Sequence, residues 1–346
     1  MKTLIFISII SMIFLLGFCS CEKPVSDPPD VIRTMETDAF VQNGKLARSM
    51  NLGNILEAPS EGDWGLSLEA SYFSTIAEAG FTGVRLPIRW SAHASDETPY
   101  TIDPDFMARV DWAIDQAFQN DLSIVINTHH YLEMMSAPSE HLPRLLGIWG
   151  QVATHFHSRQ DDLIYELFNE PHDQFNTAIW NDYLDQLVDS IRAIDPARTL
   201  MIGTASWGGI AALDDLVLPA DSNIIVTVHY YNPFQFTHQG AEWSEGADAW
   251  LGTTWGQSSS DYTDLLQDFN RLKTWSVENN RPIYVGEFGA YNRANMAFRY
   301  AWTEAVVAAC EARDLSWGYW EFAAGFGAYD RATGQWNELL EALIQG

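Results

Sequence analysis

Cysteine is scarce in this sequence, with 3 residues in 346, and only Cys310 lies beyond residue 21. A single cysteine can form neither an intramolecular disulfide nor a zinc-binding cysteine cluster. We therefore expect Cys310 to be a small buried residue on a helix. The stability of the folded domain must then come from packing rather than from covalent or metal cross-links.

Positive charge is also scarce. The chain has 19 Lys and Arg against 46 Asp and Glu, a formal net charge of -27. Nucleic acid and other polyanions are poor partners for such a surface, so we expect no nucleic-acid binding. A neutral polymer is compatible with this charge, although the charge does not select one. The hydrophobic fraction of 47% is large enough for a sizeable core and argues against wholesale disorder.

Residues 1–21 have the pattern of an export signal. Lys2 precedes an apolar run from Leu4 to Phe18 that is too short for a comfortable membrane span. Cys21, preceded by the small residue Ser20, resembles the lipidated cysteine of a bacterial lipoprotein. We expect a protein of the bacterial cell envelope with a lipid anchor at Cys21, and an ordinary secretory signal is the alternative.

The remainder of the chain is predicted to be a short tether, residues 22–38, followed by one domain, residues 39–346. The tether contains Pro24, Pro28 and Pro29 among scattered charges. From Ala39 onward, apolar strand-like runs alternate with stretches of helical periodicity. The expected strands are 47–53, 83–87, 123–128, 163–168, 199–203, 224–229, 283–287 and 316–320. The expected helices include 67–79, 104–120, 142–158, 176–194, 261–279 and 294–313.

Eight strands with intervening helices predict an α/β fold, a single (β/α)8 TIM barrel. The strand runs are nearly continuous in apolar residues, as strands buried on both faces should be. A doubly wound open sheet would more naturally carry a glycine-rich phosphate loop after its first strand. Asn51-Leu52-Gly53-Asn54 follows the first strand here and offers no such loop.

Two glutamates stand at the ends of apolar runs, Glu170 after residues 163–168 and Glu287 after residues 282–286. In a barrel, both would project from the carboxyl ends of strands, where catalytic groups collect. Two such carboxyls are the minimum equipment for cutting a glycosidic bond, since one can exchange protons while the other attacks the sugar carbon. The pair therefore predicts a glycoside hydrolase.

Other polar and aromatic residues fall at the same strand ends. Arg85 and Tyr231 are suitable hydrogen-bond donors to Glu287, and Asn169 is suited to the sugar 2-hydroxyl. Trp320 offers a flat apolar surface for a sugar ring, and the histidines can donate to hydroxyls or tune Glu170. The complete predicted set of substrate-binding residues is Asn54, Glu57, Arg85, His129, His130, Asn169, His229, Tyr231, Trp243, Trp320 and Glu321.

Five segments together resemble glycoside hydrolase family 5, one of the retaining barrel glycosidases. They are residues 83–87, 127–130, 168–171, 228–231 and 285–289, and the resemblance spans residues 45–344. Residues 229–243 and 319–330 resemble bacterial endoglucanases, including thermophile enzymes that also accept mannan. The resemblance implies Glu170 as acid/base and Glu287 as nucleophile. It also implies that substrate or the catalytic pair is contacted by six further residues: Arg85, His129, Asn169, His229, Tyr231 and Trp320.

Tryptophan is plentiful, with 14 residues, and several follow strands: Trp64, Trp90, Trp207, Trp243 and Trp255. Most are expected to pack in the core or against the helices, and Trp243, followed by Trp207, is the best candidate for stacking on sugar. Residues 132–141 match the family less well and could alter the wall of the cleft.

The expected activity is hydrolysis of β-1,4-glucan of the cellulose type, within the chain, by a monomeric enzyme. The expected mechanism needs no metal or organic cofactor, because the histidines lack a compact metal-ligand spacing. The catalytic residues alone do not separate this activity from a β-mannanase, xyloglucanase or mixed-linkage glucanase. A non-catalytic glycan-binding protein and a protein-interaction barrel are further alternatives, and the presence of both carboxyls argues against the first of these.

Overall fold

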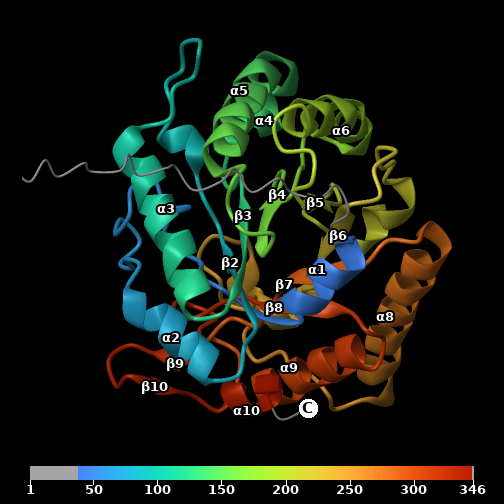
Figure 1. The fold of residues 1–346 in the computed structure, drawn as a ribbon. Coiled ribbons are helices and arrows are strands. Elements are labelled where there is room, and N and C mark those ends of the chain that lie inside the picture. The colour runs from blue at the N-terminus through green and yellow to red at the C-terminus, as the bar shows by residue number, and fades with distance from the viewer. Residues whose placement is uncertain (1–37, 345–346) are drawn as a thin grey trace, which may run out of the picture. The chain divides into compact units, whose positions relative to one another are not determined.

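A closed barrel of parallel strands is the centre of the protein, seen in a computed structural model that describes residues 38–344 (Figure 1). Eight strands follow one another around the barrel in chain order, and the last pairs with the first. This confirms the predicted (β/α)8 fold and places every strand within a few residues of its predicted bounds. The strands are β1 Arg48–Asn51, β2 Gly83–Leu86, β3 Ser123–Asn127, β4 Leu163–Glu166, β5 Leu200–Gly203, β6 Ile224–His229, β7 Ile283–Phe288 and β8 Ser316–Tyr319.

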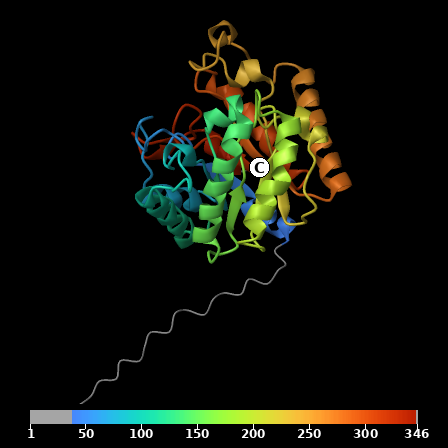
Figure 2. The ribbon, with the colours of Figure 1, turned by 90° about the horizontal axis from the view of Figure 1, so that it is seen from above.

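Helices surround the strands in both views (Figures 1 and 2). The six predicted helices are present, although α5 begins at Pro138, ahead of the predicted residue 142. Proline is well tolerated at the first helical position, because its missing N–H would have no partner there. These helices are α2 Ala70–Glu78, α3 Pro104–Gln119, α5 Pro138–Phe156, α6 Thr177–Arg192, α8 Ser259–Asn279 and α9 Met296–Glu311.

Shorter elements complete the fold, and the sequence patterns did not predict them. They are α1 Ala39–Leu46, α4 Leu132–Ser136, α7 Phe234–Thr237 and α10 Leu339–Ile344, the 3-10 turns Trp90–Ala92, Ile210–Asp215 and Ala247–Trp250, and the hairpin β9 Tyr329–Asp330 with β10 Gln335–Trp336. Residues 132–141 form α4 and the start of α5, with Met134 buried. Their effect on the cleft wall stays a prediction.

The helix α1 closes the N-terminal end of the barrel. Asn43 Nδ2 donates to the carbonyl oxygen of Ile283 at 3.2 Å, and Ser316 Oγ donates to that of Asn43 at 2.5 Å. Ile283 and Ser316 are the first residues of β7 and β8, so the helix lies where strands begin. Leu46 packs inside with a buried cluster that includes Tyr284. With this end closed, the opposite end is free to carry a site.

Burial elsewhere agrees with the expected packing. Every residue of β2 to β8 is buried, and Cys310 is a buried free thiol on α9, as predicted. Among residues 38–344, no helix combines the length and apolar character that crossing a membrane requires. The predicted signal and nearly all of the predicted tether, with the proposed anchor Cys21, lie outside the described residues.

Candidate active site

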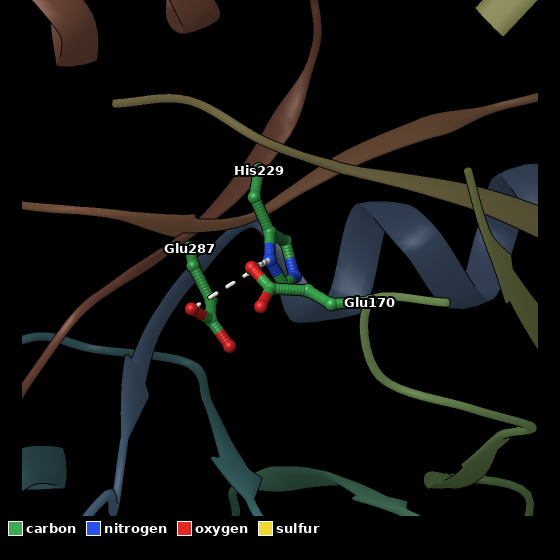
Figure 3. Close-up of side chains that lie close together, drawn as sticks. All are labelled: Glu170, His229 and Glu287. Atoms are coloured by element: carbon green, nitrogen blue, oxygen red, sulfur yellow. Dashed lines mark hydrogen bonds and ion pairs between the residues drawn. The ribbon is translucent and has the colours of Figure 1, made fainter. Parts of the chain in front are cut away.

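The two glutamates converge at the carboxyl ends of the strands, on either side of one histidine (Figure 3). Glu287 lies on β7 and His229 ends β6, whereas Glu170 lies in the loop four residues beyond β4. One nitrogen of His229 and one oxygen from each carboxyl all lie within 4.8 Å of one another. The structure thus brings together two glutamates that are more than a hundred positions apart in the sequence.

Glu287 is held by hydrogen-bond donors on both of its oxygens. Arg85 Nη1 donates to Oε1 at 2.6 Å, and Tyr231 Oη donates to Oε2 at 3.0 Å. Burial raises the pKa of this carboxyl, but the charges of His229 and Arg85 and the two hydrogen bonds outweigh burial and leave the pKa below its usual value. Glu287 is therefore ionised near neutral pH, as a nucleophile must be.

Glu170 has the opposite setting. Its oxygen Oε1 lies 2.7 Å from His229 Nδ1, and its side chain is 23% exposed. Burial raises the pKa of this carboxyl, the negative charge of Glu287 adds to the effect, and the opposing contacts with His229 do not cancel it. Glu170 also has a φ of 49°, a left-handed conformation that is uncommon for a side chain of this size.

His229 couples the two carboxyls. Its Nδ1 atom is 2.7 Å from Glu170 and 3.6 Å from Glu287 Oε2. Burial lowers the pKa of the imidazole, but the charges of Glu287 and Glu170 raise it above the ordinary value. Two carboxyls whose pKa values are pushed apart are the mark of an acid and a nucleophile with separate roles.

These three groups are also of the kind that a divalent cation binds, since imidazole and carboxylate are common ligands. Their contacts with each other, with Arg85 and with Tyr231 are those of an acid–base pair and its donors. The expectation that catalysis needs no metal stays a prediction.

Comparison with known proteins identifies the family. The family model described as Cellulase (glycosyl hydrolase family 5) matches residues 47–325. The chain belongs to glycoside hydrolase family 5. It is 32% identical over 329 residues to Endoglucanase H of Acetivibrio thermocellus, which covers 93% of this chain but 35% of that longer protein.

Solved structures of the family share the whole barrel. The structure of Thermotoga maritima Cel5A in complex with cellobiose has a TM-score of 0.88 and 50% sequence identity, and covers 89% of this chain and 100% of that chain. The same enzyme in complex with mannotriose gives a TM-score of 0.88 and 49% identity over the same shares. The expected family and fold are confirmed by these matches.

His129, His130 and Trp320 form a cluster of rings that pack against one another. The rings of His129 and Trp320 are stacked with centroids 5.9 Å apart, and His130 lies edge-on to His129 and to Trp64. Burial lowers the pKa of His129 well below its ordinary value and that of His130 to about 4. Both imidazoles are neutral near pH 7, so each offers one donor and one acceptor to hydroxyl groups.

The side-chain amide of Asn169 is oriented by Arg85, because its Oδ1 accepts a hydrogen bond from Arg85 Nη2 at 2.7 Å. That bond fixes which way the amide faces, and the predicted contact with the sugar 2-hydroxyl stays a prediction. Asn54 has a φ of 64° and is half-buried, three residues beyond the end of β1. Its contact with substrate is likewise a prediction.

Glu57 and Glu321 are bonded to the protein backbone in the structure. The oxygens of Glu57 accept hydrogen bonds from the backbone N–H groups of Asn54 and Ile55. Those of Glu321 accept hydrogen bonds from the backbone N–H groups of Ala323, Ala324 and Phe326. Both side chains are essentially buried, at 1% and 0% exposure. They organise the loops that follow β1 and β8, and direct sugar contact by either one remains a prediction.

The expectation that most of the five tryptophans following strands are packed inside was wrong, because three of them are exposed. Trp90 and Trp255 are buried in the core, whereas Trp243 is 61% exposed, Trp207 55% and Trp64 44%. Trp243 packs edge-on to Tyr291, with ring centroids 4.9 Å apart. An exposed indole is a suitable platform for a pyranose ring, and stacking of a sugar on Trp243 stays a prediction.

Two histidines near the site were not predicted. His172 stacks on Trp207 with ring centroids 4.4 Å apart. His238 stacks on Phe234 at 4.0 Å and lies 4.9 Å from the ring of Tyr231; burial lowers its pKa to about 4. His172 follows the Asn-Glu-Pro segment directly, and His238 lies in the segment after β6, so position relative to the strand ends was the available signal.

Proposed function

We propose that this protein is an endo-acting β-1,4-glucanase that hydrolyses cellulose-type polysaccharide with retention of anomeric configuration. The observation that carries the proposal is a pair of carboxyls whose pKa values are shifted in opposite directions. One oxygen of each lies within 4.8 Å of one oxygen of the other. Retaining glycosidases separate their carboxyls by about 5–5.5 Å, and inverting enzymes by about 6.5–9.5 Å. Relatives named endoglucanases support the choice of glucan.

In the first step, an oxygen of ionised Glu287 attacks the anomeric carbon and forms a glycosyl ester. The bond from that carbon to the leaving oxygen breaks, and the proton of Glu170 passes to that oxygen. The donors Arg85 and Tyr231 hold the attacking carboxylate in place. The raised pKa of Glu170 favours its protonated form, as a proton donor requires.

In the second step, water attacks the same carbon and the ester bond to Glu287 breaks. Glu170, now ionised, accepts a proton from that water, which restores the starting state. His229 lies 2.7 Å from Glu170 and stabilises its charged form in this interval. Each step of the scheme uses side chains of this chain and water alone.

The test is hydrolysis of carboxymethyl cellulose, mixed-linkage glucan, glucomannan and xyloglucan by wild type and by Glu170→Ala and Glu287→Ala variants. Wild type should release new reducing ends with a rapid fall in viscosity, and proton NMR should show the β-anomer first. Both variants should fold normally and lose activity. Full activity in Glu287→Ala would refute the mechanism, and glycan binding without hydrolysis by wild type would indicate a non-catalytic binding protein.

Mannan is the second candidate substrate. The related Thermotoga maritima enzyme has been solved with mannotriose as well as with cellobiose, and the two catalytic carboxyls do not distinguish glucose from mannose. The C2 hydroxyl differs in orientation between these sugars, so contacts around Asn169 bear on the preference. A ratio of kcat/KM for glucan over glucomannan measured on one preparation decides the order.

We further propose that the protein acts at the bacterial cell envelope as a monomer, attached through a lipid on Cys21. The pattern of Lys2, the apolar run and the small residue before Cys21 supports this attachment. Radioactive palmitate should label the wild-type protein and leave a Cys21→Ala variant unlabelled. Retained label in the variant would contradict the choice of cysteine, and secretion of unlabelled wild type would indicate an ordinary signal.

A further inference from the structure

A third carboxyl, Glu166, lies beneath the catalytic pair and has no role in the scheme above. It is the last residue of β4 and is 1% exposed, so it makes no contact with substrate. Its two oxygens accept hydrogen bonds from Arg85, from Nε at 2.6 Å and from Nη2 at 2.8 Å. This bidentate pair is the strongest contact that Arg85 makes.

Arg85 uses all five of its N–H donors. Two are taken by Glu166, and one each by Asn51 Oδ1 at 2.9 Å, Asn169 Oδ1 at 2.7 Å and Glu287 Oε1 at 2.6 Å. The bidentate bond to Glu166 fixes the plane of the guanidinium. That plane determines where the single N–H for Glu287 points, so Glu166 acts on the nucleophile through Arg85.

The charges of these three side chains also connect Glu166 with Glu287 through Arg85. Arg85 carries one positive charge and forms ion pairs with two buried carboxylates, Glu166 at 2.6 Å and Glu287 at 2.6 Å. If Arg85 were paired with Glu287 alone, it would neutralise the nucleophile and make it a poor one. Because Glu166 takes a share of the same charge, the trio keeps a net charge of -1 and Glu287 retains more basicity.

We propose that Glu166 is a positioning residue for catalysis: it fixes the guanidinium of Arg85 and shares its charge, and so sets the basicity of the nucleophile Glu287. This inference rests on the proposed function, which assigns the nucleophilic role to Glu287. A purely structural ion pair would stabilise the barrel without any effect on the ionisation of Glu287.

Other titratable groups face this trio and remain unchanged when Glu166 is replaced. His229 on β6 and Tyr231 beyond it contact Glu287 directly, and Tyr284 on β7 lies close enough to interact with Arg85, Glu166 and Glu287. The remaining groups that interact electrostatically with Arg85 or Glu287 are His129, His130, Glu170 and His238. A shift in the pKa of Glu287 that accompanies Glu166→Gln is therefore transmitted through Arg85 rather than caused by the loss of another titratable group.

The test compares Glu166→Gln and Glu166→Asp with wild type on dinitrophenyl β-cellobioside. This leaving group departs without a proton, so the acidic limb of the pH–rate profile reports the ionisation of Glu287 alone. Glu166→Gln should move that limb down by about one pH unit and lower kcat for glycosylation about tenfold, with KM changed less. Glu166→Asp keeps the charge but shortens the side chain, so it should lower kcat and leave the limb in place.

A control is another buried arginine–carboxylate pair among the described residues, Arg198 with Asp195 at 3.0 Å, both side chains at most 1% exposed. Asp195 lies between α6 and β5, at the end of the barrel opposite the site. Asp195→Asn should lower the melting temperature as Glu166→Gln does, yet leave the pH limb where wild type has it. A shift in neither variant, or the same shift in both, would overturn the proposal.

A measurement without substrate separates this proposal from the proposed function. Carbon-13 NMR of the Glu287 carboxyl, assigned with a Glu287→Gln variant, gives its titration directly. The midpoint should fall by about one unit in Glu166→Gln. An inactive wild type would refute the proposed function while this titration still decided the charge sharing, and an unmoved midpoint would refute the charge sharing in an active enzyme.

Discussion

Replacement of Glu57 by glutamine should reverse the sign of its effect on stability between acid and alkaline pH. Glu57 is buried in the β1 loop, where its carboxyl accepts backbone N–H groups, one of them from Ile55 at 2.9 Å. Burial raises its pKa from 4.5 to about 7, despite these hydrogen bonds. The folded protein therefore binds a proton at this site that the unfolded chain releases above about pH 4.5.

The sign and size of the effect follow by linkage. A raised pKa means that stability is fully present below the unfolded value of 4.5 and is lost as the pH rises through about 7. A difference of about 2.5 pKa units, at about 1.4 kcal/mol per unit, corresponds to about 3 kcal/mol. Glutamine imitates the neutral acid at every pH, so it escapes this loss.

The assay is urea unfolding at pH 4.5 and at pH 8. Glu57→Gln should be equal to wild type or slightly less stable at pH 4.5, since one hydrogen bond to the loop is lost. From pH 4.5 to pH 8, the unfolding free energy of Glu57→Gln should rise by about 3 kcal/mol relative to that of wild type. The same difference in unfolding free energy at both pH values would refute the reasoning.

Glu61 provides a control of opposite sign. Arg109 donates to both of its oxygens, at 2.7 and 2.9 Å. Burial raises the pKa of Glu61, but the hydrogen bonds and charge of Arg109 outweigh burial and lower it. A lowered pKa contributes stability above the unfolded value that is lost as pH falls, so Glu61→Gln should be more destabilising at pH 8 than at pH 4.5.

Three further outcomes are expected. Glu170→Ala should lower polymer hydrolysis by roughly 100-fold or more, whereas the burst of dinitrophenolate from the aryl cellobioside should persist, because that step needs no proton donor. Trp243→Ala should raise KM for a soluble glucan roughly fivefold with a normal melting temperature, and unchanged kinetics would remove this exposed indole from the site. Gly289→Ala should lower stability by about 1–3 kcal/mol and reduce activity, because its new Cβ would lie 2.0 Å from the carbonyl oxygen of Trp320. The control is Gly150→Ala, whose added Cβ would have no heavy atom within 4 Å. In urea unfolding it should be neutral or slightly stabilising.

Local patterns accounted for the barrel because each strand of a (β/α)8 fold is buried on both faces and reads as an apolar run. The bounds of β4 and β7 follow from such runs, and Glu170 and Glu287 follow from their position at strand ends. The helix α1 was missed, because a short plug needs no long amphipathic pattern. Its contacts with the starts of β7 and β8 exist only when the barrel is closed.

The sequence did not predict the burial and hydrogen-bond partners of the side chains at the strand ends. Position alone placed Glu57 and Glu321 with the substrate-binding residues, but their oxygens are taken by backbone N–H groups of neighbouring loops. Exposure separated Trp64 from Trp90, between which the sequence showed no preference. Burial and hydrogen-bond partners are properties of the closed barrel, and no spacing of residues along the chain encodes them.

The sequence by itself determined the strand order, the two catalytic carboxyls and the residue types around them, because these follow from periodicity, position and chemistry. The tertiary structure decided how the environments of the two carboxyls differ, raising the pKa of Glu170 and lowering that of Glu287. That distinction depends on distances of a few ångströms, such as those from Arg85 and Tyr231 to Glu287 and from His229 to Glu170. Electrostatic interactions depend on separation in space and on burial, and both arise only when strands distant in the sequence close into one barrel.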